Sequence, residues 1–131
     1  MSDSRTVNLV GGRGYTGSEL LRLIARHPQM ELGMASSRSE EGQSLSSICP
    51  EWPEDGRTFT RLEPESVAAY PADAWVLALP NGAAGQWVEC IRGMLPDSVI
   101  LDLSADYRFD PQWTYGLPER YRDDIRRARL I

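Results

Sequence analysis

Short apolar runs and segments of helical periodicity alternate along the first part of the chain. The β-rich run Thr6–Val10 ends at glycines, and Glu31–Ser36 is a second run of strand type. Between them, Tyr15–His27 has helical spacing, and Pro28 ends it. A strand–helix–strand unit of this length implies a right-handed crossover between parallel strands. The expected inward face of the helix is formed by Leu20, Leu23, Ile24 and His27.

The alternation continues after a polar stretch. Residues 38–58 are rich in Ser, Glu, Pro and Gly, which predicts a long loop with one helical turn. Beyond it, the pattern predicts strands at Thr58–Leu62, Trp75–Leu79 and Val99–Leu103 (the last two buried on both faces), and the start of one at Arg129–Ile131. It predicts helices at Glu63–Tyr70 with Pro64 in first position, along the apolar stripe Ala84, Trp87, Val88, Ile91 and Leu95, and within Leu117–Arg127. We therefore expect one α/β domain over residues 1–131, a Rossmann-type, doubly wound, mainly parallel sheet with helices on both faces.

A glycine-rich turn joins the first strand to the first helix. The run Gly11-Gly12-Arg13-Gly14-Tyr15-Thr16-Gly17 matches both G-x-G-x-x-G and G-x-x-G-x-x-G spacing. Glycines permit the tight turn and a close backbone approach to a pyrophosphate, while the helix N-terminus offers free N–H groups and a positive dipole end. Its place inside a βαβ unit favours dinucleotide binding. The alternative is a tight turn with no ligand.

The residues at the end of the second predicted strand indicate which dinucleotide the chain binds. Where NAD sites usually place Asp or Glu, this chain has Ser36-Ser37-Arg38. Two hydroxyls and a guanidinium bind a 2′-phosphate that a carboxylate would repel, and Arg13 is placed to reach the same phosphate or stack on adenine. We therefore expect NADP(H) rather than NAD(H). The alternative role of Arg38 is a solvated loop charge.

Two later loops are expected at the same edge of the sheet. Leu79-Pro80-Asn81-Gly82 follows one buried strand, and Asn81 is either a ligand of the nicotinamide or ribose or an ordinary turn residue. Ser104 and Ala105 follow the next strand and are expected near the nicotinamide half. Their neighbours are candidates for a structural ion-pair network, which would comprise Asp102, Asp106 and Arg108.

Composition narrows the possible functions. The net charge is −5, and the sequence has no basic stripe with interleaved aromatic residues. We therefore do not expect nucleic acid as a partner. The chain has no Lys, which excludes a lysine Schiff base or a phosphate-loop lysine. Cys49, Cys90 and His27 fit no metal spacing, so we expect no metal site. With no long apolar run and no signal segment, we expect no membrane span and a cytoplasmic location.

Several motifs lie along the chain: residues 14–23, His27-Pro28, Ser37-Arg38, Leu79-Pro80-Asn81-Gly82, residues 101–108 and Tyr115-Gly116-Leu117-Pro118-Glu119. Together they resemble the N-acetyl-γ-glutamyl-phosphate reductases of arginine biosynthesis, which belong with the aspartate-semialdehyde dehydrogenases. The likeness spans nearly the whole chain. One departure is Asn81, where the family often has His.

This resemblance implies an NADPH-dependent reductive dephosphorylation of an acyl phosphate to an aldehyde through a cysteine thiolate, assisted by a histidine. It places the catalytic cysteine a few residues beyond Arg129–Ile131, so this chain would supply cofactor binding only, without the catalytic domain, and would turn over nothing. Arg108, Tyr115 and Glu119 are implied on the substrate side. The parent enzyme would be a homo-oligomer, with this fragment a monomer or weak dimer.

The residues of this chain agree with a role in cofactor binding and not in catalysis. Thioester chemistry requires a Cys activated by a nearby base. Cys90 falls in the middle of a helix as a packing residue, Cys49 lies in an acidic loop that opposes a thiolate, and His27 closes a helix as a structural residue.

Three alternatives stay open. The first is a related semialdehyde dehydrogenase, acting on aspartyl or aminoadipyl phosphate. The second is a stand-alone dinucleotide-binding sensor module. The third is an α/β interaction domain with an empty glycine loop.

Overall fold

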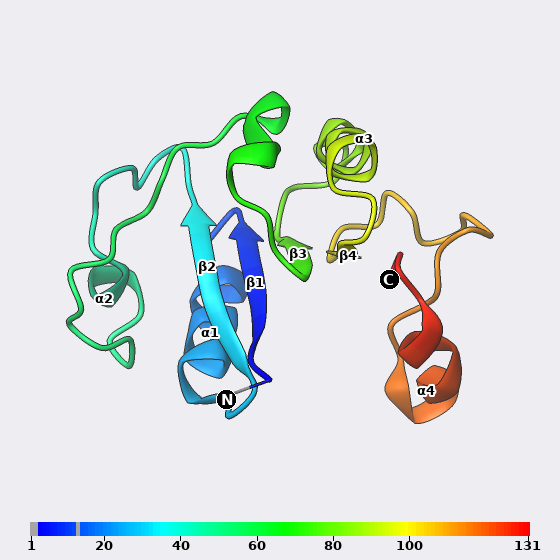
Figure 1. Cartoon of the computed structure of the whole chain (residues 1–131), viewed down its shortest axis with the longest axis horizontal. Helices are drawn as coiled ribbons and strands as arrows, with labels where there is room; N and C mark the ends of the chain where they lie inside the picture. Colours follow the sequence, from blue (N-terminus) through cyan, green and yellow to red (C-terminus); the bar gives the residue numbers. More distant parts are fainter. Residues whose placement is uncertain (1–2, 13) are drawn as a thin grey trace.

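A four-stranded parallel sheet forms the centre of the computed structural model, which describes residues 3–12 and 14–131. The spatial order is β2-β1-β3-β4, so the chain leaves β1 on one side to form β2 and returns on the other side to form β3 (Figure 1). The predicted doubly wound α/β fold is confirmed. The strands are β1 (Arg5–Val10), β2 (Met30–Ser36), β3 (Ala74–Leu77) and β4 (Val99–Asp102).

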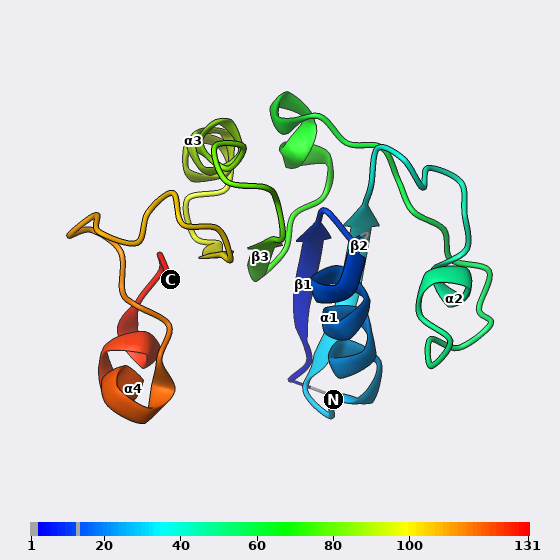
Figure 2. The same ribbon diagram turned by 180° about the vertical axis from the view of Figure 1, so that it is seen from behind.

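Helices cover both faces of this sheet. Helix α1 packs over β1 and β2 on the face shown in Figure 2, and η1 and α3 lie side by side over the opposite face. Helix α4 lies beyond β4, near the C-terminus (Figure 1). The helices are α1 (Gly14–Arg26), α2 (Leu45–Ile48), the 3₁₀ helix η1 (Pro64–Ala69), α3 (Gly85–Met94) and α4 (Pro118–Arg127).

Strand β2 contains a bulge that decides which side chains face which layer. Val7 pairs with Leu32, but Leu9 pairs with Ala35, so β2 has one extra residue there. Leu32 and Ala35 therefore join the α1 side of the core, while Met34 joins the η1 and α3 side. The buried Asn8 side chain accepts a hydrogen bond from the Met34 amide (N···O 3.0 Å), which satisfies a backbone group at the bulge.

The buried face of α1 differs from the expected one. The structure buries Gly17, Leu21 and Ile24, whereas Leu23 is 51% exposed and His27 lies in solvent just after the helix. Of the four residues predicted for the inward face, Ile24 is correct, Leu20 is half-buried, and Leu23 and His27 are wrong. Gly17 packs closely on the backbone of Gly12, so the face of α1 that carries Gly17 is the face turned toward the glycine turn.

The segment between β2 and η1 contributes to the core more than its polar composition indicates. The predicted helical turn is confirmed as α2, and residues from this segment are buried against α1 and β2, namely Leu45, Cys49, Trp52 and Phe59. The strand predicted at Thr58–Leu62 is wrong in extent, because it forms only isolated bridges such as Ser36 with Thr60. At the edge of β2, the side chain of Arg57 satisfies backbone carbonyls that a neighbouring strand would otherwise pair with. Its guanidinium donates to the carbonyls of Leu32 (2.7 Å) and Gly33 (2.6 Å).

The last residues pair with β4. The Ile100 amide donates to the Arg129 carbonyl (2.8 Å) and the Asp102 amide to the Ile131 carbonyl (2.8 Å), so the predicted start of a strand is confirmed as a short parallel pairing. The expectation that Val99–Leu103 is buried on both faces is wrong apart from Ile100, since its neighbours are half-buried or exposed. The helices predicted around Pro64, along the stripe from Ala84, and within Leu117–Arg127 are confirmed as η1, α3 and α4.

Candidate functional site

The carboxyl ends of β1, β2 and β3 meet where the chain order reverses. The amides of Gly11 and Gly12 donate to the Ser36 carbonyl at the end of β2 (3.1 and 2.9 Å). On the other side, the Ala78 amide donates to the Val10 carbonyl (2.8 Å). In an open α/β sheet, a ligand binds in the crevice at such a switch point.

Each glycine of the turn after β1 has a separate physical reason to be glycine. Gly11 has φ of +81°, and a Cβ there would lie 2.3 Å from the Ala78 carbonyl oxygen, so the turn passes directly over β3. A Cβ on Gly17 would lie 2.4 Å from the Gly12 carbonyl carbon, which fixes the start of α1 against the turn. Gly12 itself lies against the ring of Phe59, 2.7 Å from a Cβ built there.

Gly14 is the glycine that faces open space. It has φ of +89°, a backbone conformation that favours glycine, and nothing described lies within 4 Å of a Cβ built there. It is also the first residue of α1, so the amides of Gly14, Tyr15 and Thr16 belong to the first turn, where a helix offers no carbonyl partner. Tyr15 is 98% exposed and points away from the core. Arg13 lies outside the described residues.

A pocket of about 730 Å³ opens beside this turn. It brings together seven of the residues expected at the cofactor: Gly11, Thr16, Ser36, Ser37, Arg38, Leu79 and Pro80. Sequence reasoning missed the opposite wall, because that wall depends on how η1 and α3 pack against each other, which no local motif encodes. The further lining residues are Val10, Ser39, Leu62, Pro64, Ala78, Ala83, Gln86 and Trp87.

The residues that follow β2 divide between buried hydroxyls and an exposed cation. Ser36 and Ser37 are buried, and the Ser37 Oγ lies 3.4 Å from the Ser39 Oγ. The side chain of Arg38 is exposed at the rim, where its guanidinium donates to Glu63 (3.2 Å). A solvent-exposed ion pair of this kind is weak and leaves further guanidinium N–H groups for an incoming anion.

The loops after β3 and β4 are joined to each other. Asn81 accepts a hydrogen bond from the Ala105 amide through its Oδ1 (2.9 Å), and Asp106 accepts from the amides of Gly82 (2.7 Å) and Ala84 (3.3 Å). Ser104 donates through its hydroxyl to Asp102 (2.6 Å). Asn81, Asp102 and Asp106 therefore act on loop structure through backbone amides and a hydroxyl.

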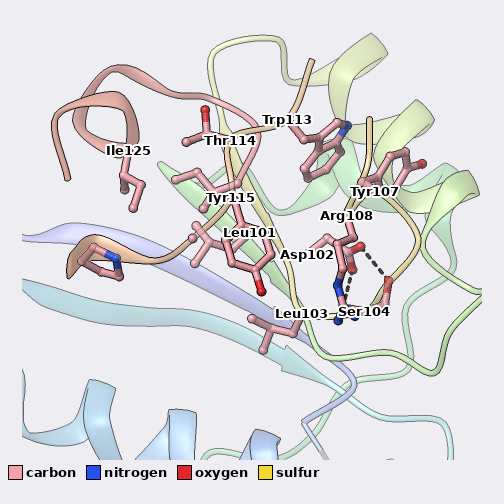
Figure 3. A pocket seen from close by; sticks show the side chains of 13 residues that line it. Leu101, Asp102, Leu103, Ser104, Tyr107, Arg108, Trp113, Thr114, Tyr115 and Ile125 are labelled. Atoms are coloured by element: carbon pink, nitrogen blue, oxygen red, sulfur yellow. Dashed lines mark hydrogen bonds between the residues drawn. The ribbon is translucent and has the colours of Figure 1, made fainter. Parts of the chain in front are cut away.

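A second pocket of about 460 Å³ lies between β4 and α4 (Figure 3). It is lined by Ser104, Arg108 and Tyr115, among mainly apolar neighbours, and Glu119 is not among its lining residues although the adjacent Pro118 is. Tyr107 stacks on Trp113 at its edge, with ring centroids 4.2 Å apart. Burial, and then the carboxylates of Asp102, Asp106 and Asp110, raise the pKa of Tyr107 above its ordinary value.

Neither cysteine is placed as a nucleophile. Cys49 follows α2 in the acidic loop expected from the sequence, but its side chain is buried in the core beside α1 and is therefore shielded from a substrate. Burial and nearby Glu65 and Glu89 raise the pKa of the Cys90 thiol, which opposes a thiolate. His27 accepts a hydrogen bond from the Gln29 amide at the end of α1 (3.0 Å).

The described part of the chain offers neither a cluster of metal ligands nor a membrane-spanning helix. Within residues 3–12 and 14–131, no group of three or more His, Cys, Asp or Glu side chains is placed to hold a metal ion. Over the same residues, none of the helices has the length and apolar character of a membrane span.

The family model for the semialdehyde dehydrogenase NAD-binding domain matches residues 6–128. This chain belongs to that family. Among curated relatives, this NAD-binding domain is 49% identical over 123 residues to the N-acetyl-gamma-glutamyl-phosphate reductase of Stenotrophomonas maltophilia (strain R551-3), covering 93% of this chain and 38% of the relative. It is 44% identical over 127 residues to the enzyme of the same name from Xanthomonas axonopodis pv. citri (strain 306), covering 97% and 40%.

Solved structures show the same fold at much lower identity. An aspartate semialdehyde dehydrogenase with NADP from Candida albicans superposes with a TM-score of 0.69 at 15% identity, covering 88% of this domain and 34% of that chain. Aspartate semialdehyde dehydrogenase II from Vibrio cholerae superposes with a TM-score of 0.68 at 17% identity, covering 98% and 37%. The domain spans about two fifths of the length of the curated relatives, which have 38% and 40% covered.

Proposed function

We propose that this domain binds NADP(H) in the pocket beside the glycine turn. We further propose that the whole protein is an NADPH-dependent reductase that converts N-acetyl-γ-glutamyl phosphate to the semialdehyde with release of phosphate. The observation that carries the proposal is the opening of α1: Gly11 and Thr16, on either side of Gly14, line the pocket at the switch point, and Thr16 belongs to the first turn of α1. Identities of 44–49% to reductases of that name support the choice of substrate.

The residues present fit such a cofactor part by part. A pyrophosphate suits the α1 opening, because unpaired amides and a helix dipole favour negative charge there. The pocket volume of about 730 Å³ lies in the range of small-molecule sites. Ser36, Ser37 and Arg38 offer hydroxyls and a cation to a 2′-phosphate at the end of β2, and the Candida albicans protein of the same fold was solved with NADP.

When bound, the cofactor supplies a hydride, and the contribution of this chain is to hold and orient it. The joined loops after β3 and β4 support this role, because Asn81, Ser104 and Ala105 lie at the same edge of the sheet as the glycine turn. We propose that the nicotinamide half rests against these loops. Because the Asn81 Oδ1 accepts a hydrogen bond from the Ala105 amide, Asn81 holds the loop after β3 to the loop after β4.

The second pocket is the proposed place for the acyl phosphate. Arg108 lines it and carries a permanent positive charge suited to a phosphoryl group, and Tyr115 also lines it (Figure 3). Glu119 lies in the first turn of α4, beside the pocket but not in its lining, so its place on the substrate side stays a prediction. The cytoplasmic location and the homo-oligomeric parent also stay predictions.

Titration calorimetry of this chain with NADPH and NADH tests the proposal. NADPH should bind at least about tenfold more tightly, because one charge-assisted contact to the 2′-phosphate contributes about 1.5 kcal/mol or more. Equal affinity for both coenzymes, or binding of neither, would contradict it. A parallel assay should detect no reduction of N-acetyl-γ-glutamyl phosphate by this chain, since Cys49 is buried and the pKa of Cys90 is raised.

A further inference from the structure

A second arginine, Arg61, shares a carboxylate partner with Arg38, which lines the cofactor pocket. Arg61 lies in the segment that follows the bridge between Ser36 and Thr60, and the Ser37 amide donates to the Thr60 carbonyl (3.1 Å). This pairing places Arg61 alongside the residues that follow β2. No sequence motif singled it out, because the segment is separated from β2 by more than twenty residues of loop and short helix.

The side chain of Arg61 belongs to the glycine-turn side of its segment. Phe59 is buried against Gly12, and along extended backbone the side chains of residues two apart share a face. Arg61 and Glu63 therefore follow Phe59 on one side, while Leu62 is buried on the other and lines the pocket. The backbone of Glu63 is extended, with φ of −100° and ψ of 152°, as this alternation requires.

Both arginines contact one carboxylate. Arg38 lies 3.2 Å from one oxygen of Glu63, and Arg61 lies 3.4 Å from the other. Two guanidiniums on a single carboxylate leave one positive charge in excess and several unused N–H donors. Because all three side chains are substantially exposed, these ion pairs are weak and can be exchanged for contacts to a stronger anion.

We propose that Arg61 is a second specificity-determining cation for the 2′-phosphate of NADP(H), with Glu63 holding Arg38 and Arg61 together before the cofactor arrives. This inference rests on the proposed cofactor function and adds a residue to it. A phosphate monoester carries a charge of about −1.5 to −2 at neutral pH, so it matches two guanidiniums better than one. The fork geometry of Arg also suits the phosphate oxygens in a way that a point charge does not.

The test compares two probes that differ only in the 2′-phosphate, adenosine 2′,5′-bisphosphate and 5′-AMP, by calorimetry on this chain. Arg61→Ala should weaken binding of the bisphosphate about tenfold and change 5′-AMP affinity less than about twofold. Arg61→Lys should weaken the bisphosphate about threefold, because the charge stays and the fork is lost. Arg126→Ala, which removes an exposed arginine from α4, should change neither affinity.

The outcomes separate the two levels of the proposal. If the unmodified chain does not prefer the bisphosphate to 5′-AMP, the proposed NADP(H) site itself is wrong. If the preference exists and Arg61→Ala retains it, Arg61 has no part in it and this inference fails. Equal weakening of both probes by Arg61→Ala, with Arg61→Lys behaving like alanine, would indicate a structural role and would also overturn it.

Discussion

Replacing Gly17 by alanine puts a methyl group into the contact between α1 and the glycine turn. The added Cβ would lie 2.4, 2.5 and 2.8 Å from the carbonyl carbon, carbonyl oxygen and Cα of Gly12. These are backbone atoms, so no side chain can rotate away to make room. Either α1 or the turn has to move, and the amides at the opening of α1 move with it.

The magnitude follows from comparison with a second helical glycine. Gly93 lies in α3, and nothing described lies within 4 Å of a Cβ built there, so Gly93→Ala should stabilise the domain by about 0.8 to 1 kcal/mol through helix propensity alone. Gly17→Ala has the same propensity gain but adds an overpacking cost of about 1 to 3 kcal/mol. The propensity contribution cancels between the two variants, so their free energies of unfolding should differ by about 1 to 3 kcal/mol.

Urea denaturation followed by circular dichroism measures this difference, and thermal unfolding should show it as roughly 3 to 4 °C per kcal/mol for a chain of this size. Calorimetry on the same samples should show that Gly17→Ala weakens NADPH binding at least about tenfold while Gly93→Ala leaves it unchanged. If Gly17→Ala stabilised the domain as much as Gly93→Ala and kept the affinity for NADPH, the argued role of this contact would be wrong.

Three further predictions concern other parts of the fold. Asp106→Ala should lower the free energy of unfolding by about 1 kcal/mol, measured in urea, because its carboxylate accepts hydrogen bonds from the amides that lead into α3; no change would mean that solvent replaces these contacts. Arg57→Ala should expose the carbonyls at the edge of β2 and increase concentration-dependent light scattering; scattering equal to that of the parent chain would argue against this protective role. The pKa of Tyr107 is raised, so the folded chain holds this proton longer than the unfolded chain: its contribution to stability is complete below pH 10 and is lost as pH rises through the folded-state value. Tyr107→Phe should therefore make the alkaline fall in stability shallower, and an unchanged profile of unfolding free energy above about pH 9 would contradict the assignment.

The sequence predicted the structure best where a short stretch of residues determines its own conformation. The glycine turn, the strand–helix–strand unit around it and the stripe from Ala84 to Leu95 all follow from spacing, and each is found as predicted. The ends of β1, β2 and β3 also meet where the topology of an α/β sheet places a ligand. These features depend on short-range physics, namely backbone freedom, helix periodicity and the handedness of the crossover.

The errors arise where contacts between distant segments decide the outcome. Leu21 and Leu23 are equally apolar, but Leu21 shares a helix face with Gly17, which packs on Gly12, and it is buried, whereas Leu23 is exposed. The bulge in β2 depends on the side chain of Asn8, which lies in another strand. The opposite wall of the cofactor pocket, including Trp87, comes from η1 and α3. No short motif encodes how these two helices pack against each other.

The central claim is that the amides at the opening of α1 hold the diphosphate of the coenzyme. Amide chemical-shift mapping of the isotope-labelled chain during titration with NADPH tests it most directly. We expect the amide signals of Gly11, Gly14 and Thr16 to shift most, those of the residues after β2 to shift less, and those of α4 to stay in place. Largest shifts around the pocket between β4 and α4, with the glycine turn unaffected, would contradict it.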